Sequence, residues 1–123
     1  MKLREAIERI DSLKHNTFTQ GDKVEWLNRL DGLVKTQIID THEGAEEVEF
    51  SGYSERENME TELLVPAPYD DVYIRWLEAQ IDYYNGELGR YNNSIAMFNT
   101  AYEAYQRFYN RTHKPIGKKF RFF

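Results

Sequence analysis

Histidine and carboxylate side chains are the residues of this chain that could do chemistry, and their spacing argues against catalysis. His15, His42 and His113 have no partner at the spacing of a zinc motif such as HExxH. Glutamates follow His42, but that segment lacks the D-x-[DN]-x-[DN]-G pattern, followed by a glutamate at fixed spacing, of an EF-hand calcium loop. No cysteine is present to form a thiolate site or a nucleophile. We therefore expect no metal site here.

Other arrangements that could support catalysis are also missing from the sequence. Asp70 and Asp71 are adjacent, and adjacent helical residues point in different directions, so they make a poor acid–base pair. Negative charge at this point suits the start of a helix instead. There is no glycine-rich phosphate loop and no G-x-S-x-G nucleophile motif. The sequence therefore predicts no enzyme, no catalytic residue and no cofactor.

The composition is that of one small domain with an excess of aromatic residues. The chain has 123 residues, with 16 basic and 21 acidic side chains and a net charge of −5. This balance argues against a protein whose whole surface binds nucleic acid. No apolar run approaches the roughly 18 residues of a membrane-spanning helix. Eighteen residues are aromatic and nine of these are tyrosine, which is more typical of an interaction protein than of an enzyme.

Apolar residues at helical spacing predict a mainly α fold. Leu27, Leu30, Val34 and Ile38 form one stripe, and Thr19 with Asp22 resembles a capping box at its start. Tyr84 is expected on the buried stripe of a later helix. We expect a small bundle of about four helices, within a domain of residues 1–113, at residues 2–13, 19–42, 70–85 and 90–112.

A strongly acidic segment interrupts the helices. Residues 43–62 contain eight glutamates and one basic residue, and apolar and acidic residues alternate around Val48 and Phe50. A period of two predicts a strand, so we expect one short β-hairpin insertion within residues 43–65. A lone hairpin is marginally stable and must pack on the helices or on a neighbouring subunit. Its acidic candidates for a subunit interface or a channel lining are Glu46, Glu47, Glu49, Glu55 and Glu57.

Aromatic residues gather in the second half of the chain, where 14 of the 18 fall within residues 69–123. Tyr102, Tyr105 and Tyr109 follow helical spacing and have two interpretations, a packed core or part of a subunit interface. Residues 114–123 form a basic and aromatic tail, interpreted either as an undocked terminus, as a docking segment or as a weak nucleic-acid contact. The candidate docking residues are Lys114, Ile116, Lys118, Lys119, Phe120, Arg121, Phe122 and Phe123.

Several runs in residues 19–117 resemble small prophage proteins of Gram-positive bacteria, in particular the helical head–tail connector, or adaptor, proteins of tailed phages. The runs that carry the likeness are residues 63–71 (LLVPAPYDD), Tyr73, Trp76, Leu77, and residues 79–83 (AQIDY), 90–94 (RYNNS), 97–99 (MFN) and 109–113 (YNRTH) with Pro115.

The resemblance implies a structural protein of the virion neck, present in the host cytoplasm before assembly. Copies of such connectors form a ring, typically of about twelve, between the portal protein and a tail-side neck protein, and DNA passes through the channel. The resemblance carries over no catalytic residue, and it makes the tail an arm that docks on the portal. Whether the isolated chain is a monomer stays open. The alternative is a small nucleic-acid-binding or regulatory phage protein that uses its basic tail.

Overall fold

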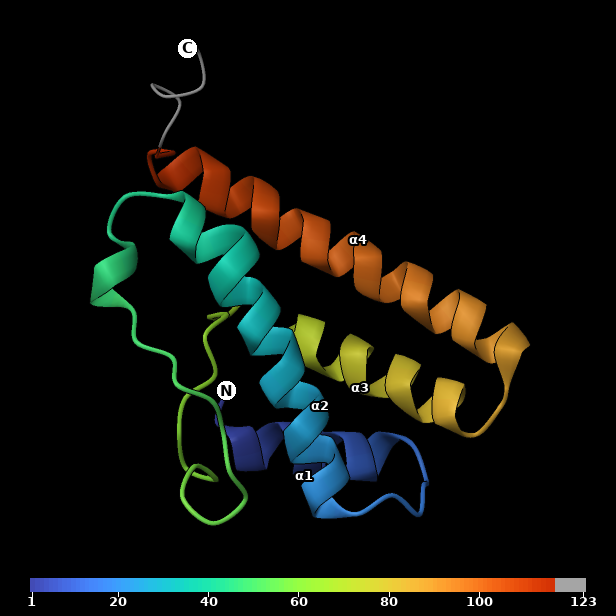
Figure 1. Ribbon diagram of the computed structural model, residues 1–123. Coiled ribbons are helices and arrows are strands. Elements are labelled where there is room, and N and C mark those ends of the chain that lie inside the picture. Colours follow the sequence, from blue (N-terminus) through green and yellow to red (C-terminus); the bar gives the residue numbers. More distant parts are fainter. Residues whose placement is uncertain (117–123) are drawn as a thin grey trace.

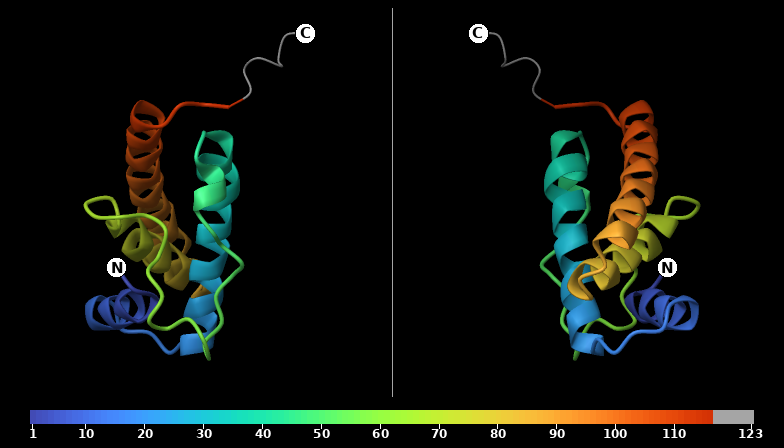
Figure 2. Two further views of the ribbon diagram at one scale, coloured as in Figure 1. Left: turned by 90° about the vertical axis from the view of Figure 1, so that its left-hand side faces the viewer. Right: turned by 90° about the vertical axis from the view of Figure 1, so that its right-hand side faces the viewer.

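The computed structural model describes residues 1–116, which fold into a bundle of four α-helices (Figure 1). Helices α3 and α4 form an antiparallel hairpin, and α3 also contacts the two earlier helices. Helix α1 lies at one end of the bundle, across the start of α2 (Figure 2). The predicted mainly α fold class is confirmed. The helices are α1 (Leu3–Leu13), α2 (Gln20–Leu33), α3 (Asp71–Tyr84) and α4 (Leu88–Thr112).

Helix α2 begins at the predicted capping box. The Asp22 amide donates to the Thr19 hydroxyl over 3.0 Å, and the Thr19 amide donates to the Asp22 carboxylate over 3.2 Å. Phe18, just before the cap, packs edge-on against Trp26 with the ring centroids 5.2 Å apart. These contacts satisfy amide groups that a helix start would otherwise leave without a partner.

The helix predicted for residues 19–42 is continuous but changes its winding. After α2 come a π-helix, η1 (Val34–Ile38), and a 3-10 helix, η2 (Ile39–Thr41). Within this region the Thr36 hydroxyl donates to the Gly32 carbonyl over 2.9 Å. Gly44 follows with a φ of 91°, a left-handed conformation that glycine adopts without a steric penalty. Gly44 therefore lies just beyond the end of the helix, in the turn that follows it.

The core is made largely by the predicted stripes. The side chains of Leu27, Leu30, Val34 and Ile38 are all buried. The expectation for Tyr84 is wrong, because this side chain is 51% exposed. Tyr84 is the last residue of α3, where its ring stacks on Trp26 at the end of the helix and about half of the side chain stays exposed.

The predicted β-hairpin is absent from the described residues. Residues Ala45–Glu47 form a short 3-10 helix, η3, and no strand forms between it and α3. The amides that a hairpin would pair are bonded to side chains of α2 instead: Tyr53 donates to Asn28 over 2.8 Å, and Leu64 donates to Asp31 over 3.0 Å. The alternation around Val48 and Phe50 thus marks one-sided packing of an extended loop.

The start of the chain pairs with the end of this loop. The Leu3 amide donates to the Thr61 carbonyl, and the Leu63 amide donates to the Met1 carbonyl, each over 2.9 Å. Arg4 Nε lies 2.6 Å from a Glu60 carboxylate oxygen, and this ion pair lowers the pKa of Glu60 to about 2. No helix within residues 1–116 is long and apolar enough to cross a membrane.

Candidate interaction surfaces

Asp31 fixes the long loop to the bundle. Its carboxylate is fully buried and accepts hydrogen bonds from the Tyr73 hydroxyl, over 2.7 Å, from the Leu64 amide and from the Tyr53 hydroxyl. The Tyr73 hydroxyl in turn accepts from the Val65 amide over 2.7 Å. Burial raises the pKa of Asp31, and the hydrogen bonds from Tyr53, Tyr73 and Leu64 oppose that rise. Among the described residues no cation forms an ion pair with this carboxylate. Asp31 therefore holds the loop through hydrogen bonds from uncharged donors.

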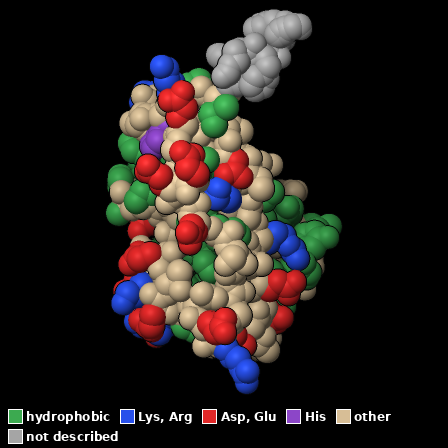
Figure 3. All heavy atoms as spheres, turned by 60° about the vertical axis from the view of Figure 1, so that its left-hand side comes forward, with side chains coloured by type: hydrophobic (Ala, Val, Ile, Leu, Met, Phe, Trp, Pro, Cys, Tyr) green, Lys and Arg blue, Asp and Glu red, His purple; other side chains and the backbone are tan. Residues whose placement is uncertain are grey.

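The acidic candidates lie on the outer side of the loop, and their side chains are exposed. Glu55 accepts a hydrogen bond from the Gln20 side chain over 3.0 Å, across to the start of α2. None of the five acidic candidates forms an ion pair within residues 1–116. The face in Figure 3 carries acidic side chains from top to bottom, with basic ones between them. The exposed candidates are Glu46, Glu47, Glu49, Glu55 and Glu57.

The three tyrosine candidates of α4 divide between core and surface. Tyr105 and Tyr109 are buried in this chain's own core, with exposed fractions of 2% and 7%. Tyr102 is half-buried, and its hydroxyl donates to the Gln37 side chain over 3.2 Å. Burial, with a smaller effect from the Asp31 charge, raises the pKa of Tyr102 to about 12. Of the three, Tyr102 is therefore the one that the single chain leaves partly open to a partner.

The first residues of the tail are paired within the chain, which differs from the undocked-terminus interpretation for residues 114–116. The Glu43 amide donates to the Lys114 carbonyl over 2.8 Å, and the Ile116 amide donates to the Thr41 carbonyl over 2.9 Å. The side chains of Lys114 and Ile116 are exposed. The remaining docking candidates, Lys118, Lys119, Phe120, Arg121, Phe122 and Phe123, lie outside the described residues.

His42 joins this pairing to α4. The imidazole is 5% exposed, with Nδ1 2.7 Å from the Ile38 carbonyl and Nε2 2.9 Å from the Asn110 side-chain oxygen. Its ring also packs edge-on against Tyr109, which stacks on His113 with a centroid distance of 3.7 Å. Because both ring nitrogens are engaged, His42 is a structural residue. No group of metal-ligating side chains occurs within the described part of the chain.

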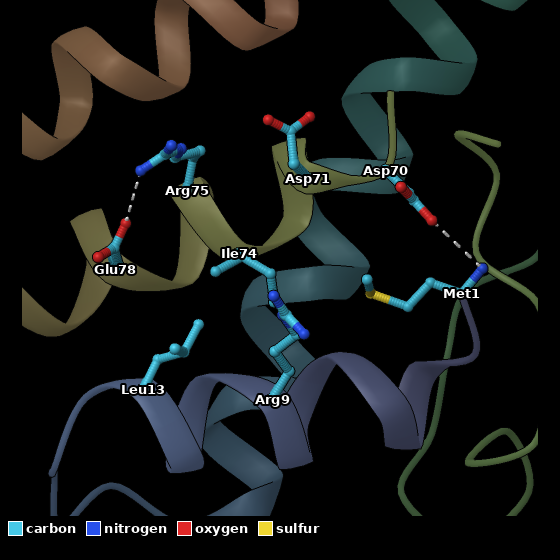
Figure 4. A pocket seen from close by; sticks show the side chains of 8 residues that line it. All are labelled: Met1, Arg9, Leu13, Asp70, Asp71, Ile74, Arg75 and Glu78. Atoms are coloured by element: carbon cyan, nitrogen blue, oxygen red, sulfur yellow. Dashed lines mark ion pairs between the residues drawn. The ribbon is translucent and has the colours of Figure 1, made fainter. Parts of the chain in front are cut away.

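A groove of about 500 Å³ lies between α1 and α3 (Figure 4). Its apolar part is formed by Met1, Leu13 and Ile74, and Leu13 is 59% exposed. Around these lie charged groups of both signs: the Asp70 carboxylate is 3.8 Å from the Met1 amine, and Arg75 is 3.6 Å from Glu78. The groove therefore combines a small apolar surface with charged groups of both signs, among which two oppositely charged pairs form.

Five aromatic side chains form a continuous array near the α3–α4 turn, which we call the aromatic ladder. Neighbouring rings lie 5.1–5.5 Å apart, and Trp26 and Tyr84 are stacked with an angle of 3° between their planes. Tyr83 and Tyr84 are each 51% exposed, and Leu88, the first residue of α4 after the turn, is 64% exposed. In order, the ladder consists of Phe18, Trp26, Tyr84, Tyr83 and Tyr91.

Sequence reasoning missed this ladder because its members come from three separate segments. The adjacent pair Tyr83–Tyr84 before Asn85 and Gly86 was an available signal, since two successive residues at a helix end cannot both face one core. Asp31 was missed for a related reason: an aspartate inside an amphipathic helix is usually solvated.

Comparisons of this chain with protein-family models, with curated proteins and with solved structures found no match.

Proposed function

We propose that this chain is a structural protein of a phage particle: a head–tail connector whose copies form a ring between the portal and the tail-side neck proteins. The observation that carries the proposal is the exposed apolar surface at the α3–α4 turn, where Tyr83, Tyr84 and Leu88 are all more than half exposed. A contiguous apolar patch on a small domain is typical of an assembly surface. A subunit of a ring has such an apolar patch because the patch is buried only when a neighbouring subunit covers it.

The residues that carry the resemblance to connectors also support the proposal, because most of them build the α3–α4 hairpin. Trp76 of α3 donates to the Trp26 carbonyl over 2.8 Å and packs against Phe98 of α4. Ser94 of α4 donates to the buried Asp82 carboxylate over 2.9 Å. The contacts of these residues hold the α3–α4 hairpin in place, and the connectors that the chain resembles are also helical.

The exposed glutamates of the loop suit a protein through whose ring DNA passes. Adhesion to DNA comes mainly from lysine and arginine neutralising phosphates, and unpaired carboxylates repel the backbone. In the proposed ring the acidic face lines the channel or meets a neighbour, while the tail contacts the portal. Lys114 and Ile116 are the described residues that begin this portal contact.

The test is to mix the full chain with the portal protein of the same prophage and to image the complex by electron microscopy. We expect an additional ring seated on the portal. The matched variant replaces Lys118, Lys119 and Arg121 with serine and is expected to reduce ring occupancy. If no ring is added and the chain instead binds duplex DNA with a steep salt dependence, the connector proposal fails and the nucleic-acid-binding alternative replaces it.

A further inference from the structure

The aromatic ladder has the chemistry of a site for a basic and aromatic peptide. Its exposed tyrosines offer ring faces and edges to which a phenylalanine can pack and over which a lysine or arginine can lie. Beside Phe18, Trp26 and Tyr84 a hollow of about 220 Å³ is bordered by Asp22, Glu25 and Arg29. Arg29 is paired with Glu25 at 3.5 Å, which leaves the border net acidic.

The chain contains one segment of matching chemistry. Residues 118–123 read KKFRFF, with three cations interleaved with three phenylalanines. The α1–α3 groove fits this segment less well, because no aromatic side chain of residues 1–116 lines it. The loop glutamates offer charge without a comparable run of stacked rings. The ladder therefore combines both features that the segment needs.

This segment cannot lie along the ladder of its own chain. His42 and the pairing of Ile116 with Thr41 hold residue 116 beside Asn110, near the end of α4. Trp26, the ladder residue nearest to this point, is 15 residues before Thr41 on the continuous helix, a separation of roughly 22 Å at the helical rise. Seven residues beyond Ile116 extend at most about 25 Å, so only the last of them could approach Trp26, and residues 118–123 as a whole cannot follow the ladder. Figure 1 shows the α3–α4 turn and the C-terminal end of α4 at opposite ends of the molecule.

We propose that residues 118–123 of one copy dock on the aromatic ladder of a second copy, so that subunits associate head to tail. Such a contact joins two different surfaces and leaves one of each free, and it therefore closes into a ring or continues as a chain. It deepens the proposed function by naming the contact through which copies associate before they meet the portal. The contact itself requires no portal, and because one tail cannot serve a neighbouring copy and the portal at one time, portal binding releases it from the ladder.

The test uses two full-length variants and sedimentation equilibrium. The tail variant carries Phe120→Ser, Phe122→Ser and Phe123→Ser, and the ladder variant carries Tyr83→Ser and Tyr84→Ser, the two half-exposed members of the ladder. The unsubstituted chain is expected to self-associate between about 10 µM and about 1 mM, and each variant alone should weaken association at least about tenfold. A mixture of the two should restore a one-to-one dimer and nothing larger, because one intact tail then meets one intact ladder.

The control is Leu13→Ser, which alters an exposed apolar side chain in the α1–α3 groove and should leave association unchanged. Circular dichroism confirms that each variant is folded. An unsubstituted chain that stays monomeric throughout the concentration range overturns the inference, as does a mixture that forms no dimer. Loss of association with Leu13→Ser, but not with the ladder variant, places the contact in the groove and also refutes it. Each of these results leaves portal binding as a separate question.

Discussion

Replacing Asp31 by alanine should be among the most destabilising single changes in this chain. The carboxylate is fully buried and accepts from Tyr73, Leu64 and Tyr53. A buried donor left without its acceptor costs about 1–3 kcal/mol. Since Asp31→Ala strands at least two such donors, we expect it to lower the free energy of unfolding by about 3–5 kcal/mol.

Asp31→Asn should cost far less. The amide has the same shape, its oxygen can still accept from the Leu64 amide and from Tyr53, and its NH₂ group can donate to the Tyr73 hydroxyl oxygen, so that only the Tyr73 hydroxyl proton loses its acceptor. The substitution also removes a buried charge that no cation balances, which offsets part of this cost. We therefore expect a loss of about 1 kcal/mol. The ratio between the two substitutions tests whether hydrogen bonding, and not charge, is the role of this side chain.

The pH dependence of the same pair has a definite sign. Burial raises the pKa of Asp31, so the folded chain binds this proton more tightly than the unfolded chain. The resulting stabilisation is fully present below the ordinary aspartate pKa of about 4, and it is lost as the pH rises through the folded-state pKa. The advantage of the unsubstituted chain over Asp31→Asn should therefore be larger at acidic than at neutral pH.

The assay is urea unfolding followed by tryptophan fluorescence, repeated across pH. Glu103→Gln, an exposed change on α4, is the control and should stay within about 0.5 kcal/mol of the unsubstituted chain. Equal losses for Asp31→Asn and Asp31→Ala would refute the hydrogen-bond argument. An advantage over Asp31→Asn that grows with rising pH would show that the Asp31 pKa is depressed, and the burial argument would be wrong.

Three further predictions concern the caps and termini. Thr19→Ala should cost about 1 kcal/mol in urea unfolding because it removes the N-cap of α2, whereas the exposed Thr17→Ala should be nearly neutral. Glu60 should keep its charge to about pH 2 in an NMR titration, and an ordinary midpoint near 4 would exclude its ion pair in solution. Deleting residues 114–123 should lower stability by about 1–2 kcal/mol more than deleting residues 117–123, because only the longer deletion removes the two backbone hydrogen bonds to Thr41 and Glu43; equal melting curves would contradict this.

The helices were predictable because their evidence is local. The spacing of Leu27, Leu30, Val34 and Ile38 reports one buried face, and Thr19 with Asp22 marks where the helix begins. The loop was not predictable, because its conformation depends on Asn28 and Asp31, which lie more than 20 residues before the amides they accept from. Period-two alternation reports one-sided packing, and an extended loop on a helix face produces it as readily as a strand does.

The candidate surfaces show the same division. The tail and the acidic side chains stand out in composition, since runs of charge and aromatic residues need no partner to be recognised. Composition does not separate Tyr105 from Tyr84, because both follow helical spacing. Only the three-dimensional arrangement shows that Tyr105 is 2% exposed and Tyr84 is 51% exposed. The array from Phe18 to Tyr91 exists only once α2 lies beside the α3–α4 turn.

The π-helical turn η1 has a consequence for chain length. A π-turn holds one residue more than an α-turn, so the helix before it and the chain after it keep the orientation that an uninterrupted α-helix would give them. Loss of the exposed Thr36 can therefore be absorbed by conversion of the turn to α, with Ile38 and His42 still facing their partners. The same deletion at Arg29 would rotate everything that follows by about 100°. Natural variants that are one residue shorter should thus have their deletion in this turn.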